Sequence, residues 1–183
     1  RSSLSLTKTW RLVRLELFGD FTQEALQATY LPSGAQNVLL SEFGAHSQIV
    51  ITRDWFFQAA ARASSEGSKV TPTLGLAGQL ANKWVVFTNY SEGYRVASVT
   101  QKFAQFTGYQ GNPGLSPETS TETNVGLEKR EDDYDVTFLA FTRNFNNLID
   151  NRVVLAGVLS PFNAGQSRAN GFETRGNLKL YDE

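Results

Sequence analysis

Apolar and polar residues alternate over the first twenty positions of the chain, as they do in a β-strand that buries one face. The apolar residues occupy even positions up to residue 12 and odd positions afterwards: Leu4, Leu6, Trp10, Leu12, Val13, Leu15 and Leu17. Such a change of phase predicts a β-bulge near residue 12, or a strand that passes from one packing partner to another. Gly19 and Asp20 predict the end of this strand.

Further strands are predicted where β-branched and aromatic residues lie between turn-forming residues. Pro32, Ser33 and Gly34 predict a turn, after which two strands follow. Another strand is expected around Trp84, and only strands are expected in the last third of the chain. The expected strands cover residues 36–41, 46–52, 83–89, 121–127, 135–143, 151–159 and 172–181.

The middle of the chain favours helices. Asp54 is expected to cap a helix over residues 55–65, whose alanine-rich body has a high helix propensity. A second short helix is expected over residues 74–82. From residue 96 to residue 107 the apolar positions follow helical spacing, which predicts a third helix. Residues 22–30 fit either a short helix or a strand.

These elements predict an α+β fold dominated by an antiparallel, twisted sheet, arranged as a sandwich or a half-barrel, with two or three short helices inserted in the middle of the chain. Of the 183 residues, 40% are hydrophobic and 19% are charged, which is typical of a globular protein. A folded chain of this size has a surface of about 9,000 Å² and buries about 70% of its unfolded surface. We therefore expect a single domain over residues 1–183, with one core and a long Gly/Pro-rich loop at residues 108–120.

The composition excludes several kinds of active site. With no cysteine and one histidine, the chain has no disulfide, no thiolate nucleophile and too few imidazoles for a catalytic zinc or non-haem iron site. A pI near 5.9 argues against a protein that reads nucleic acid. The longest apolar runs have four or five residues, so no segment is expected to span a membrane. We expect no catalytic, cofactor-binding or metal-ligating residues and no enzymatic activity.

Four carboxylates lie close together in the sequence, at Glu131, Asp132, Asp133 and Asp135. A calcium-binding loop places ligands at alternating positions around a glycine and ends with a bidentate glutamate, and neither the glycine nor the spacing is present here. Residues 128–134 are therefore predicted to form a solvated hairpin turn between two strands. Weak calcium binding by residues 128–135 is the alternative that the sequence leaves open.

The single histidine, His46, lies at the start of an expected strand. Because the chain has no Gly-x-Ser-x-Gly elbow for a catalytic triad, His46 is predicted to be an ordinary surface or edge residue. Gly108, Gly111 and Gly114 have the spacing of a phosphate-binding loop. Such a loop follows a strand and precedes a helix, whereas these glycines follow an expected helix and precede Pro117, so they are predicted to form a surface loop.

Five aromatic residues admit two interpretations: Trp10, Trp55, Phe56, Phe57 and Trp84. We expect them to form the core between the sheet and the helices, although they could also line a cavity for an apolar ligand. Residues 76–106 resemble the sheet-plus-helix lipoprotein carriers of the bacterial envelope, over less than a fifth of the chain and without a lipobox cysteine. This resemblance implies an exported carrier of apolar ligands.

Charge is distributed unevenly along the chain. Residues 1–112 carry 10 basic and 7 acidic side chains, net +3, whereas residues 113–183 carry 7 basic and 11 acidic side chains, net −4. This asymmetry suits head-to-tail contact between copies, but charged loops that face solvent explain it as well.

The function predicted from these features is that of a non-catalytic structural subunit, either of a virion (capsid, decoration or tail component) or of an extracellular filament. We expect it in the virion or outside the cell, as a homo-oligomer that contacts copies of itself or other assembly subunits. The first alternative is an exported lipid carrier, in which helices close a curved sheet. A hydrolase that uses only carboxylates is the second alternative.

Overall fold

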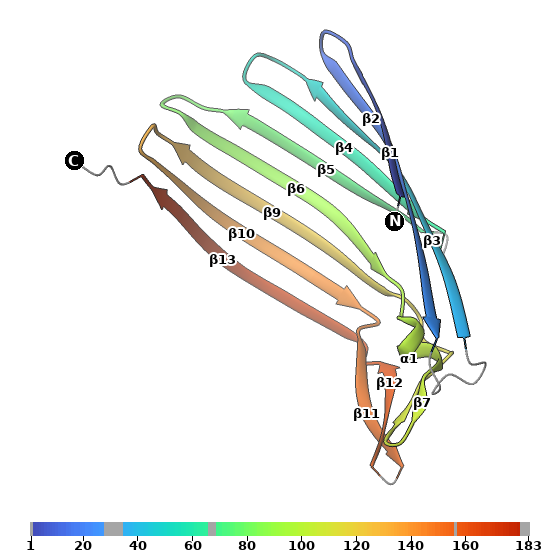
Figure 1. Ribbon diagram of the computed structural model, residues 1–183. Helices are drawn as coiled ribbons and strands as arrows, with labels where there is room; N and C mark the ends of the chain where they lie inside the picture. The colour runs from blue at the N-terminus through green and yellow to red at the C-terminus, as the bar shows by residue number, and fades with distance from the viewer. Residues whose placement is uncertain (1, 28–34, 66–68, 156, 180–183) are drawn as a thin grey trace.

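The computed structural model describes residues 2–27, 35–65, 69–155 and 157–179. They form one long, curved, antiparallel sheet and a much smaller sheet at one end of it (Figure 1). The long sheet has nine strands in the order β1-β2-β3-β4-β5-β6-β9-β10-β13. Its strands are β1 (Ser2–Thr9), β2 (Val13–Gln27), β3 (Ala35–Val50), β4 (Trp55–Ser64), β5 (Val70–Gln79), β6 (Trp84–Arg95), β9 (Glu118–Arg130), β10 (Tyr134–Asn146) and β13 (Gln166–Leu178).

Two long connections leave the long sheet at the same end, one after β6 and one after β10 (Figure 1). We call these connections, residues 96–117 and 147–165, the loop platform. Its elements are α1 (Val99–Phe103), β7 (Gln105–Phe106), β8 (Tyr109–Gln110), β11 (Ile149–Leu155) and β12 (Val158–Asn163). The four strands form the small sheet in the order β11-β12-β8-β7, and β12 runs parallel to β8. The single strand predicted over residues 151–159 is therefore a hairpin.

The opposite end of the long sheet carries turns of three or four residues, at residues 10–12, 51–54, 80–83 and 131–133. Asn82 and Lys83 have φ angles of 58° and 60°, as the two central residues of a type I′ hairpin turn require. Because each short turn joins two strands that are neighbours in the sheet, the long sheet is a series of hairpins.

The helices predicted for residues 55–65 and 74–82 are wrong. β4 and β5 occupy these segments, and they pair with each other and with β3 and β6. Alanine favours a helix in isolation, but this preference is weak, and pairing with neighbours on both sides overrides it. Of the ambiguous residues 22–30, the described part continues strand β2, and the turn predicted at residues 32–34 lies outside the described residues.

The helix predicted for residues 96–107 is much shorter in the structure. α1 has five residues and is the only α-helix among the described residues. The Ser98 hydroxyl accepts a hydrogen bond from the backbone N–H of Gln101 at 3.2 Å, and the Gln101 side chain accepts one from the Ser98 N–H at 2.9 Å. This capping box fixes the start of the helix. Strand dominance and an antiparallel sheet are confirmed, but one helix replaces the expected two or three. Within the described residues, no helix has both the length and the apolar character needed to cross a membrane.

Most of the predicted strands are confirmed, but some of their limits are wrong. The change of phase near residue 12 is the turn between β1 and β2, not a bulge, because the chain reverses direction there. The strands predicted at residues 36–41 and 46–52 are one continuous strand, β3. The loop predicted at residues 108–120 contains β8 and the first residues of β9.

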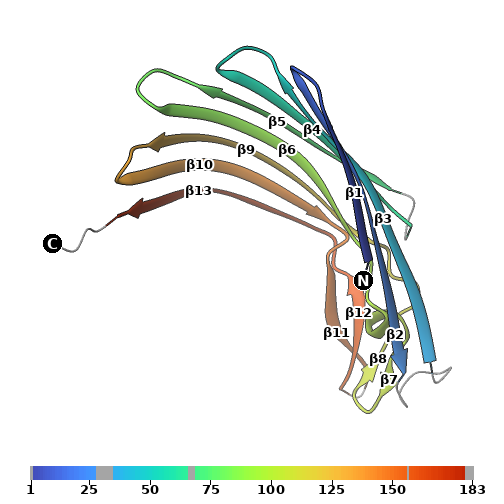
Figure 2. The same ribbon diagram turned by 45° about the horizontal axis from the view of Figure 1, so that its top comes forward.

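The long sheet is a single layer, as Figure 2 shows. Within the described residues, its strands contribute one buried apolar side chain, Ala77. The chain exposes 12326 Å², well above the surface of about 9,000 Å² expected of a compact protein of this size. Among the described residues, the buried apolar side chains are Ala77 in β5 and Ala97, Ala104 and Leu115 in the loop platform, where Pro161 is also fully buried. The expectation of one core under the sheet is therefore wrong, and close packing is concentrated in the loop platform.

Candidate functional site

One face of the long sheet is apolar and exposed. In antiparallel pairs, directly opposite residues share a face. The pairing of Val125 with Thr88, of Thr88 with Leu76 and of Leu76 with Phe57 therefore places these side chains on one face. Most of the exposed large apolar side chains of the long sheet lie on this apolar face: Leu4, Leu6, Leu17, Phe43, Ile49, Val70, Leu74, Val125, Phe138, Phe172 and Leu178.

Strands β3, β4 and β5 contribute only uncharged residues to the middle of the apolar face. These residues are Ser41, Phe43, Ala45, Ser47 and Ile49 from β3, Phe57, Ala59, Ala61 and Ala63 from β4, and Val70, Pro72, Leu74 and Leu76 from β5. An apolar surface of this extent is rare on a monomeric protein in water. It suits contact with hydrocarbon, in which a charged side chain is costly.

An aromatic residue adjoins each of the four short turns. Trp10 lies in the first turn, and Trp55, Trp84 and Tyr134 are the first residues of the strands that follow the other three. The predicted aromatic core is wrong, since Trp10 is 51% exposed and the other four residues of that set, including Trp55 and Trp84, are only half-buried. Aromatic side chains collect where a membrane meets water, because their rings are apolar and their edges polar.

The opposite face of the long sheet is polar, and it carries ion pairs and amide pairs. Arg143 donates to Glu122 at 2.8 Å, and the Asn89 side chain donates to the side-chain oxygen of Asn124 at 3.1 Å. Arg130 also pairs with Glu128 on this face. These groups need water or polar partners, so the two faces of the long sheet belong in different surroundings.

Three phenylalanine rings of the polar face each cover a glycine on the neighbouring strand. Phe18 lies opposite Gly44, Phe87 opposite Gly126 and Phe141 opposite Gly171. At Gly171, an added Cβ would lie 2.8 Å from Cζ of the ring, and the rings over the other two glycines leave even less space. The rings fill the space that these glycines leave, a recognised way to stabilise glycine positions in curved sheets.

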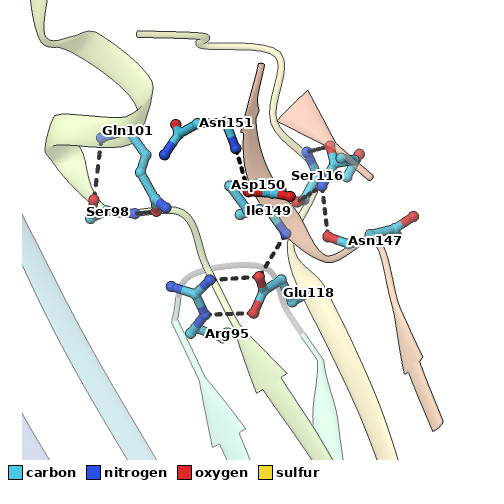
Figure 3. A network of polar contacts seen from close by, with 10 residues as sticks. Arg95, Ser98, Gln101, Ser116, Glu118, Asn147, Ile149, Asp150 and Asn151 are labelled. Atoms are coloured by element: carbon cyan, nitrogen blue, oxygen red, sulfur yellow. Dashed lines mark hydrogen bonds and ion pairs between the residues drawn. The ribbon is translucent and has the colours of Figure 1, made fainter. Parts of the chain in front are cut away.

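A polar network joins the long sheet to the loop platform (Figure 3). Arg95 Nε and Nη2 donate to Glu118 Oε2 and Oε1 at 2.6 and 2.5 Å. The backbone N–H of Ile149 donates to the same Oε1 at 2.7 Å. Because Arg95 ends β6, Glu118 begins β9 and Ile149 begins β11, one carboxylate connects three segments of the chain.

Asparagine side chains join the two long connections to each other. Asn163 accepts from the Ser116 N–H at 2.9 Å and donates to the carbonyl oxygens of Ser116 and Asn147 at 2.9 and 2.8 Å. Asn112 donates to the carbonyl oxygen of Pro161 at 3.1 Å. Together with the buried apolar residues of the loop platform, these bonds give it the character of a small packed unit.

The hairpin turn predicted in the acidic segment is confirmed, at residues 131–133 between β9 and β10. Glu131 contacts the ammonium groups of Lys83 and Lys129, both at 3.0 Å. The hydrogen bond from Lys83 lowers the pKa of the Glu131 carboxyl, and it raises the pKa of Lys83 in turn. Within the residues that the structure describes, no three His, Cys, Asp or Glu side chains are grouped so that they could hold a metal ion.

The structure places His46 on the polar face of β3, opposite Glu16 of β2. The glycines with phosphate-loop spacing belong to the loop platform. Gly108 has a φ of +82° at the turn between β7 and β8, and Gly111 lies against the backbone of α1, where an added Cβ would be 2.9 Å from Lys102. Both positions therefore have structural reasons for glycine.

The sequence did not identify the residues that connect the long sheet and the loop platform. Arg95 and Glu118 are 23 residues apart, and nothing in their spacing indicates that they meet. A usable signal was present in β9, where charged or amide residues recur at even positions such as Glu122 and Asn124. That alternation, compared with the neighbouring strands, would have revealed a polar face.

Sequence and structure comparisons place these features among known proteins. The family described as "TonB dependent receptor-like, beta-barrel" matches residues 15–182. No curated protein sequence matches the chain.

Several solved structures share the fold. The siderophore receptor PirA from Pseudomonas aeruginosa has a TM-score of 0.82 at 18% sequence identity, covering 94% of this chain and 35% of that chain. A mutant of the ferric enterobactin receptor PfeA from Pseudomonas aeruginosa, in complex with enterobactin, has a TM-score of 0.76 at 14% identity, covering 94% and 32%. The hemophore receptor HasR of Serratia marcescens, a double mutant in complex with its hemophore HasA and heme, has a TM-score of 0.71 at 14% identity, covering 92% and 40%. The chain therefore spans between about a third and two fifths of these structures.

These findings contradict the function predicted from the sequence. A match to a receptor barrel over most of the chain overturns the virion or filament subunit, its predicted location and its predicted self-assembly, and it also overturns the lipid carrier. At the level of the family, the match is to receptors and not to enzymes. The expected absence of a membrane span rested on apolar runs, which detect helices but miss strands whose apolar residues alternate with polar ones.

Proposed function

Since the chain belongs to the TonB-dependent receptor-like β-barrel family, we propose that it forms part of the wall and the outer loops of an outer-membrane receptor that imports an iron-carrying ligand. The observation that carries this proposal is the contrast between the two faces of the long sheet. One face is exposed, apolar and bordered by an aromatic row, and the other is polar and carries ion pairs.

The apolar face fits the lipid-facing side of a barrel wall, in which strands alternate between apolar and polar residues. About 9–11 residues of a tilted strand cross a bilayer, and most strands of the long sheet have this length or more. The polar face would then line the interior, which large barrels of this kind fill with other protein segments.

The connections at the two ends of the long sheet differ in length, and this difference supports an orientation of the sheet in the membrane. Barrels of the outer membrane have short turns on the periplasmic side and long loops on the outer side. The turns of three or four residues would therefore face the periplasm, next to the aromatic row, and the loop platform would face the outside. In this orientation the loop platform is the first part of the described chain that an arriving ligand would meet.

The ligand is proposed from the relatives. The similar receptors are described as binding a siderophore, ferric enterobactin, or heme delivered by a hemophore. We therefore propose that the cargo is an iron complex, either a ferric siderophore or haem, and that import changes no covalent bond of the ligand.

Cell fractionation tests the location. The protein, expressed as its gene encodes it, is expected in the outer-membrane fraction and is expected to resist extraction by sodium carbonate. Recovery in the soluble fraction would contradict a wall that faces lipid.

A growth assay tests the import. Iron-starved cells with and without the gene are offered ferric enterobactin, a ferric hydroxamate or haem as the sole iron source. Loss of growth on one of these sources when the gene is deleted, repeated when TonB is inactivated, supports the proposal. Unchanged growth on all three overturns the proposed cargo, whatever the location.

A further inference from the structure

We propose that Glu118 is a positioning residue that locks the hairpin β11–β12 onto the rim of the long sheet. The lock can be tested without any ligand, whereas its consequence for ligand capture rests on the proposed function.

The first support is the geometry of the carboxylate itself. Glu118 and Arg95 are opposite each other at the end of the β6–β9 ladder. The carboxylate accepts two hydrogen bonds from Arg95 and a third from the backbone N–H of Ile149, and its side chain is only 15% exposed. Hydrogen bonds to a charged group are roughly twice as strong as those between neutral groups. The Ile149 N–H is therefore held by an acceptor that Arg95 keeps in place.

The second support is the position of Ile149 in the hairpin. Ile149 pairs with Asn163 at the base of β11–β12. Glu118 binds the first of these residues, and Ser116, two positions earlier in the chain, binds the second. The base of the hairpin is thus clamped on both sides by one short segment that leads into β9, as Figure 3 shows in part.

The consequence concerns the exposed part of the hairpin. Arg152, whose guanidinium lies 4.9 Å from the ring centre of Phe162, and the exposed Val153 are carried by this hairpin. A clamped base fixes where these side chains stand before a ligand arrives, and such preorganisation reduces the entropy lost on binding.

A matched control lies on the same strand. Glu122 is also on the polar face of β9 and pairs with an arginine, Arg143. Its described hydrogen bonds, to Arg143 and Asn124, stay within the long sheet. Removing either carboxylate breaks one ion pair, but only the loss of Glu118 releases the hairpin.

Amide hydrogen exchange of the full chain in detergent micelles tests the lock. In Glu118→Ala, exchange of the Ile149 amide and of the β11–β12 amides is expected to accelerate about tenfold or more, because a charge-assisted bond is lost. In Glu122→Ala, these amides are expected to exchange as in the unsubstituted protein. Equal exchange in the two variants, whether fast or slow, overturns the proposal.

Two further variants keep the test decisive if Glu118→Ala does not fold. Glu118→Gln keeps a side-chain oxygen that can accept a hydrogen bond from the backbone N–H of Ile149. The Ile149 amide is therefore expected to exchange more slowly in Glu118→Gln than in Arg95→Ala. Arg95→Ala leaves the carboxylate without its anchor, and an acceleration of about threefold is expected for β11–β12. Exchange at the unsubstituted rate in Arg95→Ala overturns the proposal.

Uptake separates the lock from the proposed function. The probe is whichever of ferric enterobactin, the ferric hydroxamate or haem supports growth. Glu118→Ala is expected to raise the concentration needed for half-maximal uptake, with Glu122→Ala unchanged. Faster exchange with unchanged uptake overturns the role in ligand capture alone, and absence of uptake by the unsubstituted protein overturns the proposed function alone.

Discussion

The long sheet and the loop platform are stabilised in opposite ways. The long sheet has nine strands but, among its described residues, one buried apolar side chain, Ala77. The loop platform is much smaller, yet it contains Ala97, Ala104, Leu115 and the fully buried Pro161. The sheet depends on its backbone ladder and on what surrounds its two faces, whereas the platform depends on close packing, as a water-soluble domain does. This difference agrees with the proposed setting, in which the long sheet faces lipid and the loop platform faces water.

The largest effect is expected from a charge on the apolar face. Ala61 and Ala60 are neighbours on β4 that point to opposite faces, with Ala61 on the apolar one. Ala61→Arg is expected to lower the free energy of unfolding in lipid vesicles by about 2–4 kcal/mol if the site lies near the middle of the bilayer. Ala60→Arg is expected to have a much smaller effect. Similar losses for both would remove the distinction between the faces.

A core substitution in the loop platform should have a large but local effect. Leu115 is 7% exposed, and Leu115→Ala is expected to cost about 2–4 kcal/mol of local stability because it leaves a cavity. Protease cleavage within residues 96–117 should increase while the long sheet stays folded. The control is Leu74→Ala on the apolar face, where lipid can fill the vacated space. Greater damage from the control would mean that the platform does not depend on packing.

A smaller effect is expected where a ring covers a glycine. Gly126→Ala places a Cβ against the Phe87 ring, and a cost of about 1–3 kcal/mol is expected from overpacking. Gly176→Ala is the matched control, since its Cβ would meet only an ordinary contact at 3.6 Å. The double variant Gly126→Ala with Phe87→Leu should recover part of the loss in an unfolding titration. If the double variant is less stable than the single one, the ring is not the cause.

The smallest effect is expected from pH at the short-turn end. The pKa of Glu131 is lowered by the hydrogen bond from Lys83, so this pairing contributes stability above the ordinary carboxyl pKa and loses it as pH falls through the lowered value. The pKa of Lys83 is raised, so its contribution persists until pH rises through the raised value. Exchange of the amides in residues 131–133 should accelerate as pH is lowered through the Glu131 titration, after correction for intrinsic rates. In Glu131→Gln, this acid-induced acceleration should be absent.

Strand dominance and the acidic hairpin turn could be read from the sequence, because both follow from local alternation and turn residues. The absence of helices at 55–65 and 74–82 could not, since helix propensity is a weak preference that pairing with neighbouring strands overrides. The alternation that placed Leu4 and Leu6 on one face was correct. The assumption that an apolar face must be buried in protein was wrong. It led to the prediction of a core where the structure has an exposed surface.

The connection between the sheet and the platform was beyond sequence reasoning for a different reason. Glu118, Arg95 and Ile149 are brought together by two long connections whose paths no local pattern specifies. Single polar residues such as Asn163, which binds both Ser116 and Asn147, carry no distinctive motif. Their roles depend on tertiary distances, which a single sequence does not encode in its spacing.

The two long connections leave and re-enter the sheet at strands that are already neighbours: Arg95 pairs with Glu118, and Asn146 pairs with Thr119 on one side and with Gln166 on the other. Each long connection therefore begins and ends next to two residues that pair with each other in the long sheet. The strand pairing of the long sheet does not include the connection. A change in the length of either long connection is therefore expected to leave the register of the long sheet unchanged. The two junctions are therefore the places at which a foreign loop can be grafted with the least disturbance of the long sheet.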